Sequence, residues 1–245
     1  MNHSKRLISH YYSTHYSRFM PTTVEGWQWV LDRIELNFGK FIDTLPRDSP
    51  ILDVACGVGY LEHYLLLKGF TNIRAVDLSE EQIRIAKQKL EEYGLRYEDK
   101  VQFYIDDAFE YLRTNNGFAM IALIDFLDHL QKDKIIEILE LANIALQDNG
   151  LLLIRVTNAD NPMWGRFFYR DFTHQTPFTP DALRQCLSVT GFDVIKIDYE
   201  VLPKPRKLLA RVKQRVRWMS LWLLGKFLGI EPEAFAEDLI AVAKK

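Results

Sequence analysis

Short apolar runs alternate along the chain with longer segments whose apolar residues recur every three to four positions. The runs predict buried strands at 51–55, 73–77, 101–105, 118–124, 151–157 and 193–200. Helical periodicity fills the segments between the first five runs, and these segments end at glycines. Alternating strands and helices at this spacing predict a parallel α/β sheet. Strands that are apolar almost throughout fit such a sheet, because helices cover both of its faces.

The two ends of the chain follow other patterns. Residues 1–45 are predicted to form a helical cap before the core of residues 46–200, and residues 201–235 a basic, amphipathic helical insertion after it. The last strand, 236–245, is predicted to run antiparallel at the end of the sheet, because no simple crossover precedes it. We expect one domain over residues 1–245, with a Rossmann-like, mostly parallel sheet of seven strands, helices on both faces and an antiparallel last strand.

Composition and charge narrow the class of protein. The 245 residues are 48% hydrophobic and 26% charged, as in ordinary globular domains, and the net charge of -2 gives no bias toward nucleic acid. Two cysteines, Cys56 and Cys186, suit a reducing compartment. The N-terminus has no secretory pattern, and no apolar run is long enough for a spanning helix. A cytoplasmic protein is predicted.

Candidate chemistry begins in the stretch "ILDVACGVGY". Asp53 lies in the strand, and Gly57 and Gly59 would let the backbone turn tightly and approach a ligand at the strand's carboxyl end. The next strand ends in Asp77, whose carboxylate can accept hydrogen bonds from ribose hydroxyls. A dinucleotide fingerprint would continue to a third glycine, but that position is Glu62, which would repel a pyrophosphate. These acids favour a cationic nucleoside cofactor over a nicotinamide dinucleotide.

Five segments in order resemble the motifs of class I S-adenosylmethionine-dependent methyltransferases. They are "ILDVACGVGYLEHYL", "IRAVDLSEEQIRIAKQKL", "VQFYIDDAFEYL", "GFAMIALIDFLDHL" and "ALQDNGLLLIRVTN". The resemblance spans roughly residues 50–200 and implies methyl transfer from S-adenosylmethionine, with S-adenosylhomocysteine as the product. It implies that Asp53 binds the cofactor's amine, Asp77 its ribose and Asp107 its adenine. The implied cofactor-binding residues are Asp53, Ala55, Gly57, Gly59, Asp77, Leu78, Asp107, Ala108 and Asp125.

A hydroxyl acceptor must lose its proton during methyl transfer, and histidine is the usual base. His129 follows the fourth strand and His174 the fifth, both on the functional edge of the sheet. Two roles stay open for His129: it takes part in catalysis or substrate binding, or it forms only a structural hydrogen bond. Tyr12 and Tyr16 are candidates for a substrate lid, or for packing within a helix. No metal is predicted, although Asp125 and Asp128 offer carboxylates near one another in the sequence.

The segment "GRFFYRDFTHQTPFTPDALRQCLSVTGF" resembles a subgroup of these methyltransferases associated with bacterial surface polysaccharide and glycolipid synthesis. This resemblance implies an acceptor pocket that contains Arg170, Asp171, Thr173 and His174. Aromatic faces beside arginines suit sugars and phosphates. The alternative is a packed loop in which Arg170 and Asp171 form a structural pair. The fourth strand lacks the Pro-Pro motif of enzymes that methylate exocyclic amines, which argues against nucleobase amines.

The helical insertion is strongly basic. Residues 201–230 carry eight Lys or Arg and no acid, so the rest of the chain carries -2 - 8 = -10. Three interpretations stay open: a helix on an anionic membrane through residues 204–229, a lid or dimer face, and an ordinary amphipathic helix packed on the sheet.

The sequence therefore predicts O-methylation of a sugar or phosphate in a surface glycan or glycolipid intermediate. The protein would be cytoplasmic, with peripheral contact to the inner membrane face as an open question, and without a nucleic-acid partner. Two alternatives remain: a methyltransferase for a quinone-like or other aromatic small molecule, and a non-catalytic cofactor-binding subunit. The sequence does not indicate an oligomeric state.

Overall fold

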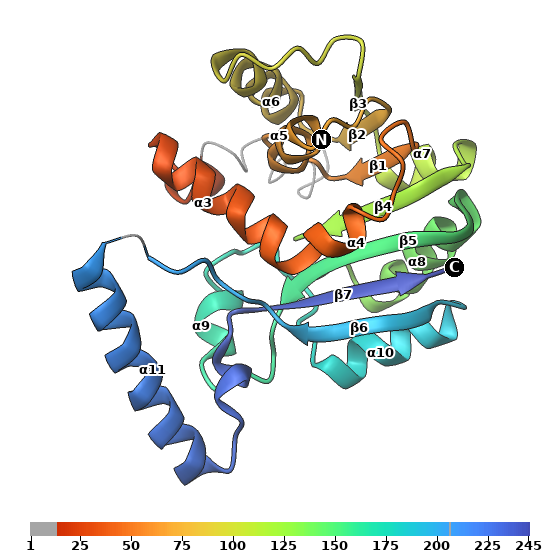
Figure 1. Cartoon of the computed structure of the whole chain (residues 1–245). Coiled ribbons are helices and arrows are strands. Elements are labelled where there is room, and N and C mark those ends of the chain that lie inside the picture. The colour runs from red at the N-terminus through yellow and green to blue at the C-terminus, as the bar shows by residue number, and fades with distance from the viewer. Residues whose placement is uncertain (1–13, 206) are drawn as a thin grey trace.

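The structure is a computed structural model that describes residues 14–205 and 207–245 (Figure 1). One seven-stranded sheet has the order β3-β2-β1-β4-β5-β7-β6. Its strands are β1 (Ile51–Val54), β2 (Ile73–Asp77), β3 (Val101–Ile105), β4 (Phe118–Ile124), β5 (Leu146–Thr157), β6 (Asp193–Tyr199) and β7 (Asp238–Lys244). β1 to β5 pair in parallel, and β7 is antiparallel to both of its neighbours. The predicted Rossmann-like fold with an antiparallel last strand is confirmed.

The place predicted for the last strand is wrong. β7 lies between β5 and β6, and β6 forms the edge of the sheet. Burial explains the exchange: five consecutive residues, 239–243, are buried in β7, whereas β6 alternates between exposed and half-buried residues. An uninterrupted apolar strand needs cover on both faces, which the interior of the sheet provides.

Helices cover both faces of the sheet (Figure 1). One face packs against α3 (Val24–Ile34), the π-helix η2 (Glu35–Gly39), α4 (Lys40–Ile42), α5 (Tyr60–Leu67) and α6 (Glu80–Glu92). The other packs against α7 (Ala108–Thr114), α8 (Lys132–Ala145) and α10 (Pro180–Val189). The side chains of Thr23, Ser79, Asp107 and Thr179 accept backbone N–H bonds at the starts of α3, α6, α7 and α10. These caps fix where each helix begins relative to the strand ends.

The remaining elements lie at or beyond the carboxyl edge of the parallel strands. They are η1 (Tyr16–Arg18), η3 (Leu127–His129), α9 (Trp164–Phe168), α11 (Leu208–Leu228) and η4 (Pro232–Phe235). α11 projects from the body of the molecule as a separate arm (Figure 1). Among the described residues, no helix has the length and apolar character needed to cross a membrane.

Candidate functional site

The turn after β1 adopts the left-handed backbone that its sequence predicts. Gly57 has φ +57° and Gly59 φ +83°, and Ala55 also has a positive φ of 57°. A Cβ on Gly59 would stand 2.9 Å from the Cβ of Ala86, so glycine is required there for space as well as for backbone conformation. The turn brings the backbone of residues 55–59 to the edge of the sheet, at the start of α5.

Asp77 ties the ends of β1 and β2 together. Its carboxylate accepts the backbone N–H of Gly57 at 2.9 Å and that of Ser79 at 2.8 Å. Burial raises its pKa from the ordinary value, while these two hydrogen bonds act in the opposite direction. Each carboxylate oxygen can accept a further hydrogen bond, as a pair of ribose hydroxyls would require.

Two buried carboxyl groups, those of Asp53 and Glu62, lie next to this turn. Asp53 is 4% exposed and Glu62 is fully buried. Neither oxygen of Glu62 lies in good hydrogen-bond geometry with a partner among the described residues, although the Asp53 carboxyl and the Glu62 backbone N–H are close enough to lower its pKa. Desolvation raises the pKa of both groups, that of Glu62 to about 7, and the mutual repulsion of the two acids adds to the shift of Asp53. Unpartnered buried oxygens are costly, so this pair is suited to a positively charged ligand group.

The ends of β2 and β3 offer an apolar surface beside these acids. Leu78 is 50% exposed and Ile105 57% exposed, which suits the faces of a flat base. Asp107 accepts the backbone N–H groups of Phe109 and Glu110 through one oxygen, Oδ1, and so caps α7, which begins at Ala108. The turn, the acids and this surface together fit a cationic nucleoside such as the expected cofactor.

Asp125, at the end of β4, is held differently from Asp53. Arg155 of β5 donates to both of its carboxylate oxygens, and the Asp125 backbone has φ +54°. Desolvation is the largest single influence and opposes ionisation of this acid, but the charge and hydrogen bonds of Arg155, together with the charge of Arg33, outweigh it and lower the pKa of Asp125. The sequence analysis does not name Arg155, although a single cation within the apolar run 151–157 is a signal of the same kind as an acid in an apolar helix.

Further ion pairs continue from Arg155 across the same edge. Glu200 lies 3.6 Å from Arg155 and accepts hydrogen bonds from Arg33 of α3, which also binds Asp238 at 2.5 Å. These contacts tie the N-terminal helical cap to β6 and β7. They join residues more than 160 positions apart in the chain, so sequence reasoning did not find them.

The two candidate bases come together, as the sequence predicts for one functional edge. The rings of His129 and His174 lie 4.7 Å apart, centroid to centroid. Two segments pair to achieve this: the backbone carbonyl of Asp128 accepts N–H bonds from Gln175 and Thr176, and the Gln175 side chain donates to the His129 carbonyl.

His129 begins a chain of hydrogen bonds. The Thr173 hydroxyl donates its one proton to Asp171 at 2.6 Å and lies 2.8 Å from Nδ1 of His129. That Nδ1 must therefore be the donor in the second contact. Burial, and then the neighbouring His174, lower the pKa of His129 to about 4. The ring is neutral at pH 7, and its Nε2 carries the lone pair.

Asp171 is the centre of a wider cluster. It is 5% exposed and lies 3.4 Å from Nε2 of His15 and 3.9 Å from Nε2 of His174, whose Nδ1 contacts the carbonyl of Phe168. One ligand atom each from His129, Asp171 and His174 lie within 4.8 Å of one another. The sequence did not identify His15 as a member of this cluster.

Arg170 faces aromatic rings at the margin of that cluster. Its guanidinium stacks over Phe19 at 4.8 Å and over Phe167 at 5.9 Å. Among the described residues it forms no ion pair with Asp171, which contradicts the predicted structural pair. Tyr16 is partly buried against the core, whereas Tyr12 falls outside the described residues.

Asp128 contributes to the fold of this edge. It is 3% exposed, and one of its oxygens accepts both the backbone N–H and the hydroxyl of Thr157. Burial raises the pKa of Asp128 to about 8. Asp125 binds Arg155 through both oxygens, and Asp128 binds Thr157 through Oδ2, whereas Oδ1 of Asp128 is buried without a hydrogen-bond partner among the described residues.

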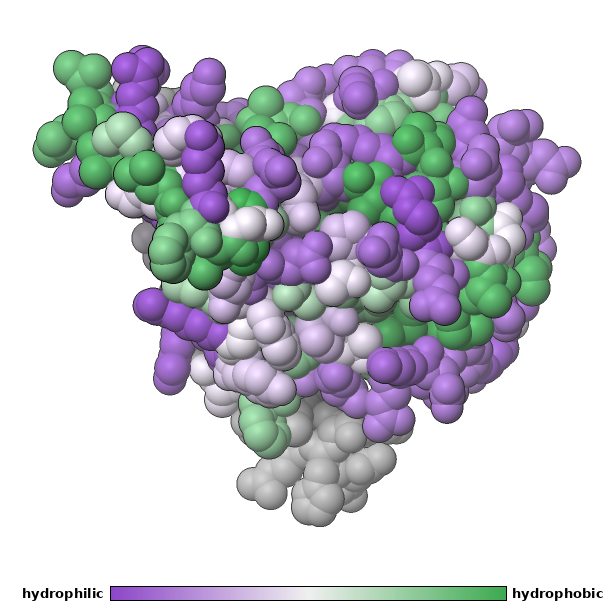
Figure 2. All heavy atoms as spheres, turned by 90° about the horizontal axis from the view of Figure 1, so that it is seen from below, coloured by the Kyte–Doolittle hydropathy of each residue, from purple (hydrophilic) through white to green (hydrophobic). Residues whose placement is uncertain are grey.

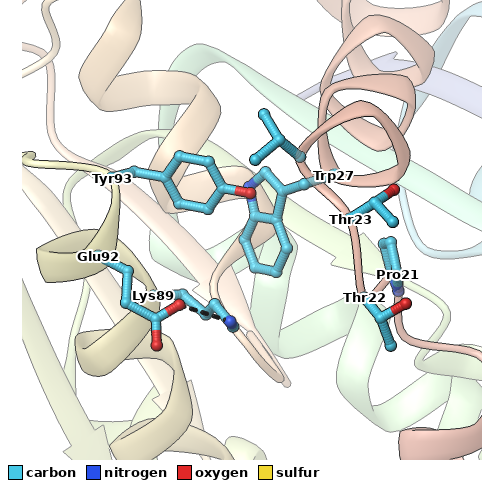
Figure 3. Close-up of a pocket in the computed structure, with 8 residues that line it drawn as sticks. Pro21, Thr22, Thr23, Trp27, Lys89, Glu92 and Tyr93 are labelled. Carbon is cyan, nitrogen blue, oxygen red and sulfur yellow. Dashed lines mark hydrogen bonds and ion pairs between the residues drawn. The ribbon is translucent and has the colours of Figure 1, made fainter.

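A pocket of about 200 Å³ lies elsewhere, between α3 and α6 (Figure 3). Trp27 and Tyr93 line it, and Lys89 pairs with Glu92 at its side. The Trp27 indole N–H donates to Nδ1 of His63. None of the predicted cofactor or acceptor residues lines this pocket.

Comparisons with known proteins agree with this geometry. The sequence profile described as "Methyltransferase domain" matches residues 27–197. Ajmaline N-methyltransferase of Rauvolfia serpentina is 28% identical over 62% of this chain and 52% of its own length. Sphingolipid C9-methyltransferase of Candida albicans is 23% identical over 63% of this chain and 32% of its own. The chain thus spans about half or less of these relatives.

A solved structure shares the fold. Magnesium protoporphyrin IX methyltransferase of Synechocystis PCC 6803, crystallised with S-adenosylmethionine, aligns with a TM-score of 0.65 and 15% identity. The alignment covers 100% of this chain and 98% of that one.

Proposed function

The chain belongs to the family of methyltransferase domains, which use S-adenosylmethionine as cofactor, and from this premise we propose that it methylates a hydroxyl or phosphate oxygen of a surface glycan or glycolipid intermediate. The hydrogen-bond chain from His129 through Thr173 to Asp171 carries this proposal. It fixes a neutral histidine in one tautomer at the edge of the sheet where a methyl acceptor would bind.

The cofactor would rest on the turn after β1. We assign Asp53 and Glu62 to its positive charges, Asp77 to its ribose, and Leu78, Asp107 and Ala108 to its adenine. Support comes from the buried carboxyl groups of Asp53 and Glu62 and from the open lone pairs of Asp77. The cofactor supplies an activated methyl group and leaves as a neutral thioether.

His129 would act as the general base. As the acceptor oxygen bonds to the methyl carbon, the hydroxyl proton passes to Nε2 of His129, while Nδ1–H stays bound to Thr173. Asp171 stabilises the resulting imidazolium through the Thr173 hydroxyl. Burial disfavours the charged ring, so the proton would be released again once the product leaves. His174 is the second candidate for this role.

The acceptor class is argued from the loop beside the histidines. Tyr169 is 75% and Phe172 86% exposed, and the Arg170 guanidinium stands over aromatic rings. Exposed aromatic faces with a guanidinium suit sugar rings and phosphates. The relatives are named for an alkaloid nitrogen and a sphingolipid carbon, so likeness to them does not supply the acceptor.

A second candidate function has one observation in its favour. Met163, Tyr169 and Phe172 leave apolar surface exposed near the site. A quinone-like or other aromatic small molecule would bury it, and His129 would serve as base for its hydroxyl in the same way.

The location belongs to the same proposal. We propose a cytoplasmic protein with peripheral contact to the inner membrane face, since a glycolipid intermediate would be carried there. The contact would be made through residues 204–229, which are basic and include α11.

Methyl-labelled S-adenosylmethionine tests the acceptor class. The protein is incubated with a cell extract, and the product is divided between organic and aqueous phases. We expect the label in the organic phase, or in an aqueous product that a glycosidase or phosphatase converts. Label only in a small aromatic product would favour the second candidate. Cofactor binding without transfer to any component would indicate a non-catalytic subunit. The His129→Gln variant, with normal cofactor binding, is the control for enzyme-dependent label.

A further inference from the structure

α11 contacts the rest of the molecule through one narrow face. Its least exposed residues are Ala210, Gln214, Leu221 and Gly225, which recur at helical spacing. Gly225 is buried, and a Cβ there would stand 2.5 Å from the carbonyl oxygen of Ile230 and 3.4 Å from the Phe235 ring. This face is therefore the one seated on η4.

Five exposed apolar residues of α11 line the opposite face, about half a turn away. They are Val212, Val216, Met219, Leu223 and Phe227, with exposed fractions from 50% to 86%. Leu208 and Leu209 extend this stripe toward the start of the helix, whereas Leu224 and Leu228 lie between the stripe and the seated face. The amphipathic helix of a globular protein normally turns such a stripe toward the core. Here the stripe points away from the body, and Figure 2 shows hydrophobic side chains at the surface of the projecting arm.

Basic residues flank this stripe on both sides. Arg211 and Arg215 lie on one side, and Lys213 and Arg217 on the other. Two tryptophans, Trp218 and Trp222, lie on the side of Arg211 and Arg215, between the stripe and the face seated on η4, and are 45% and 43% exposed. Basic side chains at the margin of an apolar stripe are typical of helices that lie in the headgroup region of a membrane.

The charge of α11 indicates which kind of surface covers its apolar stripe. Two copies of this chain paired through their stripes would bring their basic residues together without an acid between them, because residues 201–230 contain none. An anionic lipid surface complements the same residues. We propose that α11 is a docking helix, which lies flat on an anionic membrane and inserts its outward apolar stripe among the headgroups.

The root of the arm connects docking to the candidate active site. Asn158 and Asn161, both fully buried, donate from their side-chain amides to the backbone carbonyls of residues 234–236 in and after η4. Asn158 directly follows Thr157, which binds Asp128, the neighbour of His129. The docked helix would therefore hold the base, His129, at a fixed distance from the lipid surface. The purpose of this arrangement rests on the proposed function.

Sedimentation with vesicles tests the docking. The intact protein is mixed with vesicles of phosphatidylcholine alone or with 30 mol% phosphatidylglycerol added, a probe composition on the order of the anionic content of cell membranes. Binding only to the anionic vesicles, weakened but not abolished by salt, is expected. Absence of binding at low salt would overturn the proposal.

Three variants locate the contact. Replacing Met219, Leu223 and Phe227 together by Ser should reduce partitioning by roughly a hundredfold or more, through loss of buried apolar surface. Lys213→Gln with Arg217→Gln should reduce it about thirtyfold. The matched control replaces two exposed lysines of α8, Lys132→Gln with Lys134→Gln, and should change partitioning less than twofold.

Further measurements distinguish a failure of the docking proposal from misfolding and from a failure of the proposed function. Because the substituted side chains of α11 are exposed, circular dichroism and S-adenosylhomocysteine affinity should not change. A dimer of the intact protein that becomes monomeric in the stripe variant would overturn the proposal in favour of a second copy. Vesicle binding without label transfer to any acceptor would leave docking intact and contradict the proposed function.

Discussion

Acidic side chains stand at the carboxyl ends of both halves of the parallel sheet, but only at β4 and β5 does an arginine pair with one of them. At β4 and β5, Asp125 binds Arg155, and Glu200 lies near the same arginine. At β1 and β2, the structure gives neither Asp53 nor Asp77 an ion pair with any described lysine or arginine. Both halves are built on parallel strands of one sheet, so topology does not cause the difference.

The unbalanced half indicates the charge of its ligand. Burying an unpaired carboxylate is costly, and Asp53 and Glu62 are both buried, whereas Asp125, the acid that Arg155 pairs with, is 53% exposed. Asp128, the buried acid of the half at β4 and β5, forms no ion pair with a described lysine or arginine either and binds Thr157 instead. In the proposed function, the positive charges near Asp53 and Glu62 belong to the cofactor. The half at β4 and β5 would present a neutral base, His129, to an acceptor hydroxyl, which must lose its proton during methyl transfer.

The largest expected effect is on the acceptor half alone, that is, the half at β4 and β5 where a methyl acceptor would bind. His129→Gln keeps an acceptor and a donor but cannot take a proton, so kcat should fall roughly 10²- to 10⁴-fold. The dissociation constant of S-adenosylhomocysteine should stay within twofold, because His129 lies outside the β1–β2 turn. Single-turnover kinetics and calorimetry measure the two quantities.

Thr173→Val provides a graded version of the same change. It removes the hydroxyl that fixes the tautomer but leaves His129 in place, so kcat should fall about tenfold. Wild-type activity in both variants would show that His129 has only the structural hydrogen bond.

The next effect breaks the cofactor half. Gly59→Val introduces a β-branched side chain at φ +83° and within 2.9 Å of Ala86, so cofactor affinity should fall about a hundredfold. Gly117→Val is the matched control, because Gly117 has the same φ but no neighbour within 4 Å. Equal loss of affinity in both would show that general strain, not the turn, causes the effect.

How far the sequence predicts these halves depends on how local their contacts are. The bounds of β2, β3 and β4 follow from apolar runs and are confirmed at both ends. The glycine turn is equally local. The sequence prediction places β7 wrongly because the order of the strands depends on which strands are covered on both faces in the complete sheet. The sequence of one strand gives only indirect information about this.

The acceptor half depends on contacts between distant segments. His129 and His174 were candidates because each follows a strand, but the link through Thr173 joins residues 44 positions apart. Arg33 and Glu200 were missed because each is an ordinary charged residue until the fold pairs them. Glu62 did carry a signal, an acid in the first turn of an otherwise apolar helix, although it was read only as an argument against pyrophosphate.

A smaller effect separates the roles of the two unpaired acids. Glu62→Gln keeps the shape of the side chain and removes its charge, so affinity for S-adenosylmethionine should fall about tenfold. S-adenosylhomocysteine lacks the sulfonium charge and should lose less than threefold. Calorimetric titration with both ligands measures the ratio. Equal losses would assign Glu62 to the shared ammonium group, and no loss would make it a packing residue.

The smallest effect is a pH dependence of cofactor binding. In the empty site, burial raises the pKa of Asp53 and that of Glu62, the latter to about 7, and the charge of Glu62 adds to the shift of Asp53. Below that pH the pair retains a proton that the free cofactor's positive charge must displace, and above it the proton is already lost. Affinity for S-adenosylmethionine should therefore rise with pH, by at most about tenfold per unit, and level off above 7. Calorimetry at pH 6.5 in two buffers of different ionisation enthalpy should detect the released proton, and Glu62→Gln should remove it. Tight binding without proton release would mean that the pair is charged in the empty protein, and the two halves of the sheet would then differ only in their partners, not in their protonation.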